Sequence, residues 1–519
     1  MALISQLLDN PYTLQGVLVA AALVVLSAFY KDLTHGLPHK NIPVVGRGLW
    51  ELSNKKAKDR FVSSARDLIS QGFDQGRTMF QLMASFNPMI VLHPQYINEV
   101  KSHPDLDFSE ANRKAFFADY RGFEPFDGRG KDRTIILDLI NKRLTQSLGP
   151  LTIPLSRETA DTLKDGFGEP TDWESHKFAQ DIPYLVARLS SLIFLGPKVC
   201  HDKEWINVSV NYTIDAFLAA RALNMWPVIL QPLAHLFHPR ARAVRNHVRV
   251  ARQIIQKELK HREMVRAGER EDPLAAERHS DALEWMQEMA AGHPMDIAAR
   301  QIGLSLAAIH TTSNLITNVI YDLAAYPEYV QPLRDEIKAV MEEDGELKKT
   351  SLTKMKLMDS VLKETQRVNP VSLTAIHRFT MKDVQLSDGK KIPKGANMVV
   401  STHEMRDESV WEDAKTYNGY RFFNKRQEPG HENKHQLVMT SKEHIGFGYG
   451  VHACPGRFFA SNEIKILLVH LLMKYDFKFE EEQSRPKSFE LGTEIVCNPN
   501  VKVLFKAREP EIDLRSLGE

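Results

Sequence analysis

One loop near the carboxyl end of the chain constrains its chemistry more than any other stretch. Residues 447–460 present a single cysteine, Cys454, after two glycines and just before an apolar helix expected over residues 464–472. Glycine lets the backbone approach a flat cofactor closely, and the amino end of a helix favours a thiolate over a thiol. We therefore predict that Cys454 is a metal ligand, with a buried structural cysteine as the alternative.

The complete pattern of this loop narrows the choice of cofactor. It reads Phe-x-x-Gly-x-x-x-Cys-x-Gly-Arg-x-x-Ala, and every specified position is filled. A cysteine thiolate on haem iron pushes electron density toward O–O cleavage. The loop resembles that of the cytochrome P-450 family, which implies a mainly α fold with a small β part. The resemblance also implies haem b ligated by Cys454, with Phe447 and Gly448 beside it.

An apolar run near the amino end predicts a membrane anchor. Residues 14–30 are almost entirely apolar, and at 1.5 Å per residue they span about 25 Å, near the lower limit for crossing a bilayer. The first basic residues follow this run, which favours a single-pass helix with the body of the chain in the cytosol. A cleaved signal peptide is the alternative.

Composition sets further limits on the class of protein. The 519 residues include 67 basic and 66 acidic side chains without a long block of one sign, so a nucleic-acid partner is not expected. Only three cysteines are present, which argues against a disulfide framework. No repeat divides the chain. We expect an anchor at 1–30, a proline-containing hinge at 31–50 and a catalytic domain at 51–519.

A helix expected over residues 302–326 is apolar nearly all round and is therefore predicted to be buried. The polar cluster at 310–313 interrupts it, and polar groups there need partners or a purpose. In the resembled family the central helix binds dioxygen and delivers protons. The resemblance implies that Thr311 donates a hydrogen bond to dioxygen. It also implies that His310 stands in place of the usual acid and relays protons inward from water beside Thr311. Threonines bonded to their own helix are the alternative.

A Glu-x-x-Arg pair lies between this helix and the cysteine loop. Glu364 and Arg367 are one helical turn apart and can form an ion pair. Alone the motif is weak. The resembled family has the same motif between its central helix and its cysteine loop, and it adds an arginine from an aromatic-rich segment. Arg421 fits that third position. The resemblance implies a buried charge network that holds the cysteine loop.

The resemblance also assigns residues to the haem propionates and to the substrate. Arg378 is the implied propionate ligand, and His452 is a second contact. The family's tryptophan–arginine pair is missing because residues 51–172 contain no tryptophan, so Arg129 and Arg133 are only substitutes. The expected pocket residues are Ala307, Ala308, Leu373, Ala375, Ile376, Glu494, Ile495 and Val496.

These features together predict a haem-thiolate monooxygenase. It would insert one oxygen atom from O2 into an apolar, terpenoid or steroid-like secondary metabolite. Electrons must come from elsewhere because the chain shows no nucleotide or flavin fingerprint, and the family implies an NADPH-cytochrome P-450 reductase in the endoplasmic reticulum membrane. The Ala-x-His-Thr-Thr-Ser centre and the anchor resemble a fungal branch with kaurene-type terpenoid oxidases and steroid hydroxylases.

Two other classes remain open from the sequence. A haem-thiolate enzyme could isomerise or couple its substrate without net oxygen insertion, and it would keep Cys454 without needing Thr311. A membrane-anchored hydrolase could use Cys454 as its nucleophile and need no haem, although no motif pairs a base with that cysteine.

Overall fold

The computed structural model describes residues 15–16, 19, 22–23, 26, 36–48, 50–51, 53–84, 87–274, 280–480 and 484–518. Most of the predicted anchor at 1–30 lies outside these residues. The few described positions within it are helical, and Val19, Leu23 and Leu26 are exposed. Among the described residues, one helix is long and apolar enough to cross a membrane, α8 (Phe178–Leu195), but 61% of it is buried inside the protein.

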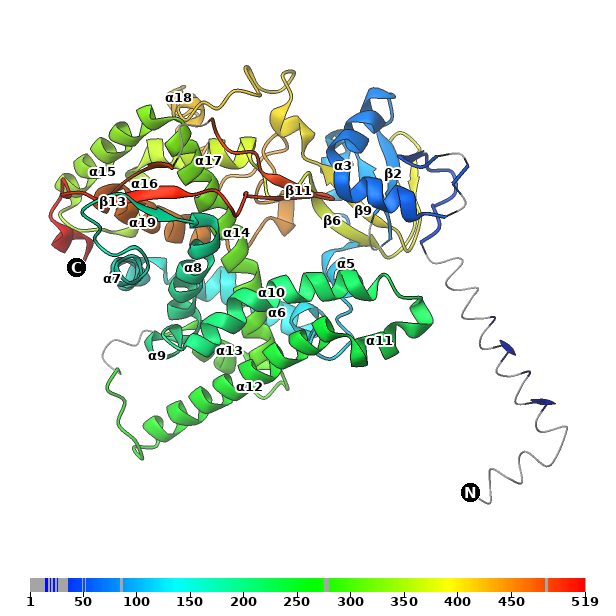
Figure 1. Cartoon of the computed structure of the whole chain (residues 1–519), viewed down its shortest axis with the longest axis horizontal. Helices are drawn as coiled ribbons and strands as arrows, with labels where there is room; N and C mark the ends of the chain where they lie inside the picture. Colours follow the sequence, from blue (N-terminus) through cyan, green and yellow to red (C-terminus); the bar gives the residue numbers. More distant parts are fainter. Residues whose placement is uncertain are drawn as a thin grey trace.

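The described body is mainly helical and is built around one long central helix, α14 (Ile297–Ala325) (Figure 1). The Asp296 side chain caps this helix by accepting a hydrogen bond from the Ala299 N–H (3.1 Å). The helices α8, α10 (Lys203–Leu223) and α12 (Pro239–Arg266) pack along it. The predicted helix over 302–326 is thus present and starts five residues earlier.

The other helices surround this centre. They are α3 (Lys55–Asp74), α4 (Ile97–Val100), α5 (Phe108–Ala115), α6 (Gly130–Asp138), α7 (Leu148–Phe167), α9 (Pro197–Cys200), α11 (Gln231–Phe237), α13 (Ala282–Ala290), α15 (Val330–Asp344), α16 (Lys349–Lys354), α17 (Lys356–Val368), α18 (Arg421–Lys425) and α19 (Arg457–Lys474).

The largest sheet has the strand order β1-β2-β3-β9-β6-β4. Its strands are β1 (Val44–Val45), β2 (Met79–Met83), β3 (Pro88–Leu92), β4 (Leu106–Asp107), β6 (Thr374–Thr380) and β9 (Asn397–Ser401). The pairing of β6 with β9 is irregular between Ala375 and Arg378, where Ile376 has a φ of +51°.

Three smaller sheets complete the β part. One has the order β10-β13-β5, and the other two are the hairpins β11-β12 and β7-β8. The strands are β5 (Glu174–His176), β7 (Val384–Gln385), β8 (Lys391–Ile392), β10 (Tyr475–Phe479), β11 (Phe489–Leu491), β12 (Glu494–Val496) and β13 (Val503–Ala507).

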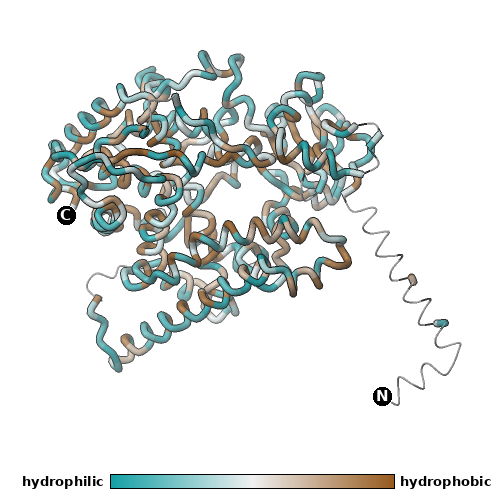
Figure 2. The backbone as a smooth tube through the Cα atoms, in the orientation of Figure 1, coloured by the Kyte–Doolittle hydropathy of each residue, from teal (hydrophilic) through white to brown (hydrophobic). Residues whose placement is uncertain are grey.

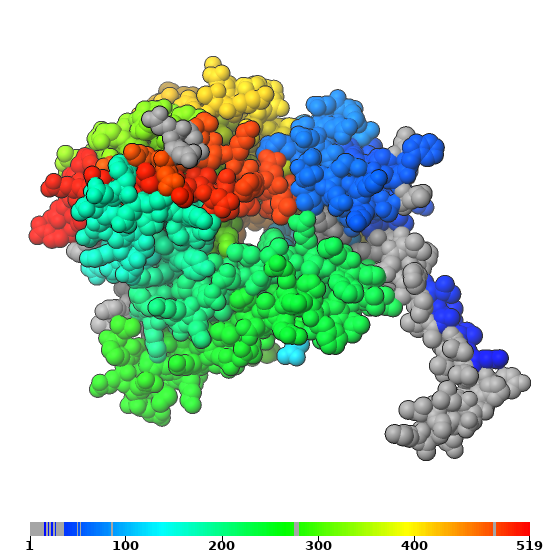
Figure 3. Space-filling model, in the orientation of Figure 1, coloured from blue at the N-terminus to red at the C-terminus, as the bar shows by residue number. Residues whose placement is uncertain are grey.

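Hydrophobic residues follow the central helices and the strands, whereas α12 is largely hydrophilic along its outer part (Figure 2). The largest hydrophobic cluster joins α7, α8, α10, α14 and α19, and two smaller clusters lie within the large sheet region. Figure 3 shows a hollow between the carboxyl-terminal strands, in orange and red, and the helices in green.

Candidate active site

Cys454 lies in a tight loop immediately before α19. Its backbone N–H donates to the Phe447 carbonyl (2.8 Å), and the Arg457 guanidinium donates to the Cys454 carbonyl (2.8 Å). Gly448 and Gly450 have φ values of +72° and +78°, which a residue with a Cβ adopts only with strain. The loop is thus fixed through its backbone, which leaves the cysteine side chain free for a ligand.

The surroundings of the three cysteines differ. Cys200 and Cys497 are buried, whereas Cys454 is partly exposed. Desolvation raises the pKa of the Cys454 thiol above its ordinary value, and the backbone N–H of Gly456 and the charge of Arg457 offset only part of this rise. Because metal ligation needs the thiolate, a bound cation would take the place of the thiol proton. Cys454 alone combines access with donors that favour a thiolate.

The middle of α14 is exposed although the helix is otherwise largely buried. Ala307 and Thr311 are exposed and Ala308 is half-buried, whereas Ile309 and Thr312 are buried. Residues four apart lie on one face of a helix, so Ala307 and Thr311 form a single stripe. The Thr311 hydroxyl donates to the Ala307 carbonyl (2.8 Å). This back-bond is the alternative that the sequence left open, but the hydroxyl oxygen still lies on the exposed stripe.

His310 is directed toward a different neighbour. Its Nε2 is hydrogen-bonded to the Val210 carbonyl of α10 (2.9 Å). Burial lowers the pKa of His310, so the neutral ring donates this bond. The predicted proton relay beside Thr311 is therefore not formed through Nε2. Consecutive residues on a helix point in directions about 100° apart. The order of residues in the sequence therefore did not show that His310 and Thr311 face different neighbours.

A group of basic side chains surrounds Arg378. Arg378 donates through Nη1 to the His377 carbonyl (2.7 Å), but its buried Nε has no hydrogen-bond partner among the described residues. Desolvation is the main reason why the pKa of Arg378 is lowered to about 10. Repulsion from Arg133 also lowers this pKa, whereas attraction to Asp107 raises it. A buried guanidinium N–H without a partner is costly, so this arrangement needs an anion.

His452 belongs to the same group of positive charges. Its pKa is lowered by burial and by repulsion from Arg378 and Arg133. Within the described part of the chain, the one carboxylate acting on Arg378 and His452 is that of Asp107, 3.3 Å from Arg133. Three basic groups around one carboxylate fit the two anionic propionates of haem. By contrast, Arg129 is exposed on the surface, where it pairs with Asp119 and Asp127.

Glu364, Arg367 and Arg421 come together in the interior. Arg367 binds both oxygens of Glu364 at 2.8 Å, and Arg421 binds one of them at 3.1 Å. Arg367 also donates to the carbonyls of Met405 and Ala414 (2.7 Å each). Every partner outside α17 lies within residues 405–421, so the network fixes that segment directly and the cysteine loop only through it.

A second set of contacts connects α17 to the segment that enters the cysteine loop. The buried Lys363 donates to the carbonyls of Gln436 (2.7 Å) and Met439 (2.6 Å), and Asp359 accepts from the Leu437 N–H (2.7 Å). Burial lowers the pKa of Lys363 to about 7. Sequence reasoning missed these residues because no motif marks contacts more than seventy residues apart.

The structure separates the expected pocket residues into two groups. Leu373 and Ile495 are buried in the same hydrophobic cluster, and Ile376 is buried in another. Glu494 and Val496 are exposed on the opposite face of β12 from Ile495. They pair across the hairpin with two further exposed residues, Leu491 and Phe489. The exposed face of the hairpin is therefore apolar except for one carboxyl group.

The carboxyl end of the hairpin lies close to α14. The Cys497 N–H, just after β12, donates to the Asn314 side chain (3.4 Å), one turn beyond Thr311. Glu494 has no hydrogen bond or ion pair among the described residues, and burial raises its pKa to about 7. A side chain that is accessible and yet desolvated lies in an interior hollow rather than in open solvent.

Comparison with known proteins agrees with this geometry. The family model described as cytochrome P450 matches residues 38–505. The chain is 37% identical over 510 residues to cytochrome P450 monooxygenase esdpI of Penicillium shearii, covering 98% of each protein. It is 40% identical over 481 residues to cytochrome P450 monooxygenase hepE of Aspergillus oryzae, covering 92% of this chain and 87% of the relative.

These matches argue against a haem-free cysteine hydrolase, because they span nearly the whole chain. They also account for a loop that presents one accessible cysteine, a buried arginine with an unpartnered N–H among the described residues and a central helix exposed at its middle. The chain belongs to the cytochrome P450 family of haem-thiolate monooxygenases and is an oxidoreductase.

Proposed function

We propose that this enzyme inserts one oxygen atom from O2 into an apolar, terpenoid or steroid-like secondary metabolite. The observation that carries the proposal is the exposed stripe of Ala307 and Thr311 on α14, close to which, at Asn314, the end of the β11-β12 hairpin is bonded to the same helix. Bound haem supplies the activation of dioxygen. A hollow bordered mostly by apolar side chains favours an apolar skeleton over a polar substrate.

Different residues around that hollow have different roles in the proposed reaction. Cys454 would hold the haem iron, and Arg378, Arg133 and His452 would neutralise the propionates. Thr311 keeps its hydroxyl on the exposed stripe, where it would donate a hydrogen bond to dioxygen near the substrate. The apolar hairpin face excludes water from the hollow.

We further propose that electrons reach the haem from an NADPH-cytochrome P-450 reductase in the endoplasmic reticulum membrane. Residues 1–30 would anchor the chain there, with residues 31–50 as the hinge and residues 51–519 facing the cytosol. Support comes from a group of exposed apolar side chains in and before α11. They are Met225, Trp226, Ile229, Leu230, Leu233, Leu236 and Phe237.

A substrate screen in microsomes tests the reaction. Terpenoids and steroids are incubated with the enzyme, added reductase, NADPH and isotopically labelled dioxygen, and products are analysed by mass spectrometry. The proposal expects one labelled oxygen atom per product and no turnover without reductase. A product that carries no label would contradict oxygen insertion and favour isomerisation or coupling instead.

A further inference from the structure

Two histidines lie together at one end of the largest sheet, and neither is among the residues assigned to the haem or the substrate. His93 directly follows β3, and His403 begins a short 3-10 helix (His403–Arg406) just after β9. The strands β3 and β9 are parallel neighbours, with Leu92 opposite Val400, so both histidines leave the sheet at the same end. The centroids of the two imidazole rings are 5.1 Å apart.

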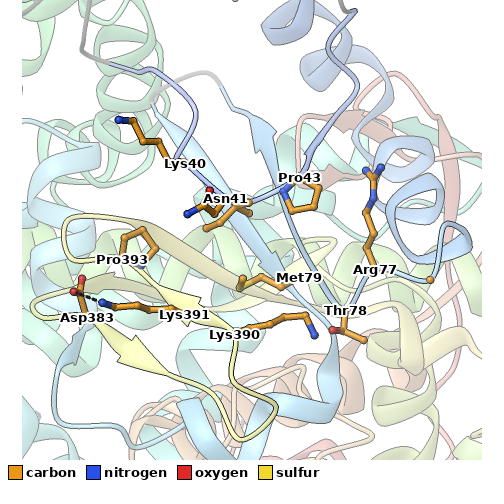
Figure 4. Close-up of a pocket in the computed structure, with 12 residues that line it drawn as sticks. Lys40, Asn41, Pro43, Arg77, Thr78, Met79, Asp383, Lys390, Lys391 and Pro393 are labelled. Carbon is orange, nitrogen blue, oxygen red and sulfur yellow. Dashed lines mark ion pairs between the residues drawn. The ribbon is translucent and has the colours of Figure 1, made fainter.

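The surroundings hold the two rings in place. The backbone N–H of His93 donates to the Thr78 carbonyl (2.9 Å), and Thr78 lies on the wall of a cavity of about 590 Å³ (Figure 4). The Phe73 ring stacks on the His403 ring (4.4 Å between centroids) and meets the His93 ring edge-on (5.2 Å). A backbone hydrogen bond and a shared aromatic neighbour thus keep the two imidazoles side by side.

A carboxyl group joins the two rings. The ligand atoms of His93, His403 and Glu404 all lie within 4.8 Å of one another. Among the described residues, Nε2 of neither ring has a hydrogen-bond partner, and the Glu404 carboxyl has neither a hydrogen bond nor an ion pair. All three side chains are half-buried, so water can still reach them. Ligand atoms around a tetrahedral zinc ion are about 3.4 Å apart, so small side-chain rotations bring these atoms to one ion.

The local charge favours a cation. Burial raises the pKa of Glu404, and repulsion from the carboxylates of Asp407 and Glu443 adds to this rise. Within the described part of the chain, Lys442 is the cation that opposes it. Asp407 also attracts positive charge at both histidines. Burial nevertheless lowers the pKa of both imidazoles, which are therefore neutral near pH 7, as metal binding requires.

We propose that His93, His403 and Glu404 bind one divalent transition-metal ion, with Zn²⁺ as the best fit. Two imidazoles and one carboxylate are ligands that Zn²⁺ accepts in tetrahedral sites, and water would fill the fourth position. Binding through Nε2 places the ring proton on Nδ1. In His403, Nδ1 would donate that proton to the Ser401 hydroxyl (3.0 Å), whereas His93 would give up a long hydrogen bond from the Gln95 N–H (3.2 Å).

The ion would join the end of the sheet to the segment that α17 holds. Met405 follows the proposed ligand Glu404 directly, and its carbonyl accepts from Arg367 of the buried network (2.7 Å). A ligand that binds only the folded state stabilises it. Zinc is therefore expected to raise the unfolding temperature of the haem-loaded protein.

Calorimetry on the full-length, haem-loaded protein tests the proposal. The protein carries no affinity tag, is dialysed against a chelator to remove loosely bound metals, and is titrated with Zn²⁺ or Ca²⁺ in neutral detergent. One Zn²⁺ per chain is expected to bind more tightly than Ca²⁺ by a factor of about ten or more, because Ca²⁺ prefers oxygen ligands. Zinc binding that is absent, or no tighter than that of calcium, would overturn the proposal.

Matched variants locate the site. His93→Ala with His403→Ala is expected to weaken zinc binding by a factor of about ten or more and to abolish the rise in unfolding temperature. His247→Ala with His293→Ala removes two half-buried histidines that each pair with a carboxylate elsewhere, and it should leave zinc binding unchanged. Glu404→Gln keeps the size of the side chain and should weaken zinc binding with the haem spectrum intact. Equal zinc affinity in the wild type and Glu404→Gln, or equal loss in both double variants, would contradict the assignment.

Discussion

At the scale of single residues, neighbours on α14 have different tasks. Thr311 lies on the exposed stripe, whereas His310 is half-buried and bonded to Val210. The hydroxyl of Thr311 is therefore positioned to act on the substrate side, and the imidazole of His310 to hold α14 against α10. This assignment separates a chemical role from a structural one within two consecutive residues.

Removing the Thr311 hydroxyl tests this separation. Thr311→Val keeps the shape of the side chain, so we expect more hydrogen peroxide per NADPH consumed and less product, while Thr311→Ser retains coupling. His310→Ala loses the bond to Val210 and is expected to lower stability by about 1–3 kcal/mol with nearly normal coupling. Peroxide release that rises with His310→Ala but not with Thr311→Val would reverse the assignment.

Glu494 is the second residue with a testable role. As the one carboxyl on an apolar face, it is placed to bind a hydroxyl group on an otherwise apolar substrate. Glu494→Leu is expected to weaken binding of a terpene alcohol about tenfold and to leave the parent hydrocarbon bound as well or better, measured by the shift of the haem spectrum.

A control lies on the other face of the same hairpin. Glu490 pairs with Arg66 at 2.6 Å, so Glu490→Leu should change the binding of neither ligand. If Glu494→Leu affects the alcohol and the hydrocarbon alike, the carboxyl group does not recognise a hydroxyl.

At the scale of elements, α17 is the support of the cysteine loop. Its Glu364 and Arg367 side chains are fully buried, and removal of either leaves an unpaired charge that costs about 3–5 kcal/mol. We expect Glu364→Ala and Arg367→Ala to lose haem content and thermal stability together. Glu343→Ala breaks the exposed pair with Lys354 and should change neither. Full haem loading in either buried variant would show that α17 does not support the site.

The sequence predicts those parts of the fold and the site that depend on interactions between residues close together in the chain. The cysteine loop, α14 and the Glu364–Arg367 pair follow from local patterns, because loop glycines, apolar periodicity and a one-turn spacing act within a few residues. The direction of the His310 side chain does not follow from a local pattern, because it depends on which helix packs against α14. The burial of Leu373 and Ile495 does not follow either, because it depends on the register of the hairpin. The contacts of Lys363 required the folded chain for the same reason.

At the scale of the whole molecule, the anchor and the catalytic body are expected to be separable. The predicted anchor at 1–30 shares no residue with the site, so deleting it should release the protein at least partly from membranes and keep the haem spectrum. Fractionation of yeast microsomes followed by spectroscopy measures both. A soluble, monodisperse truncation without the spectrum would show that these residues belong to the fold.

The central claim is that Cys454 gives a thiolate to haem iron, and one spectrum tests it most directly. The purified protein is reduced, exposed to carbon monoxide and compared with Cys454→Ala. The account predicts the red-shifted Soret band of thiolate-ligated haem in the wild type and its loss in the variant, since alanine offers no ligand. The same red-shifted band in Cys454→Ala, or its absence from haem-loaded wild type, would contradict the claim.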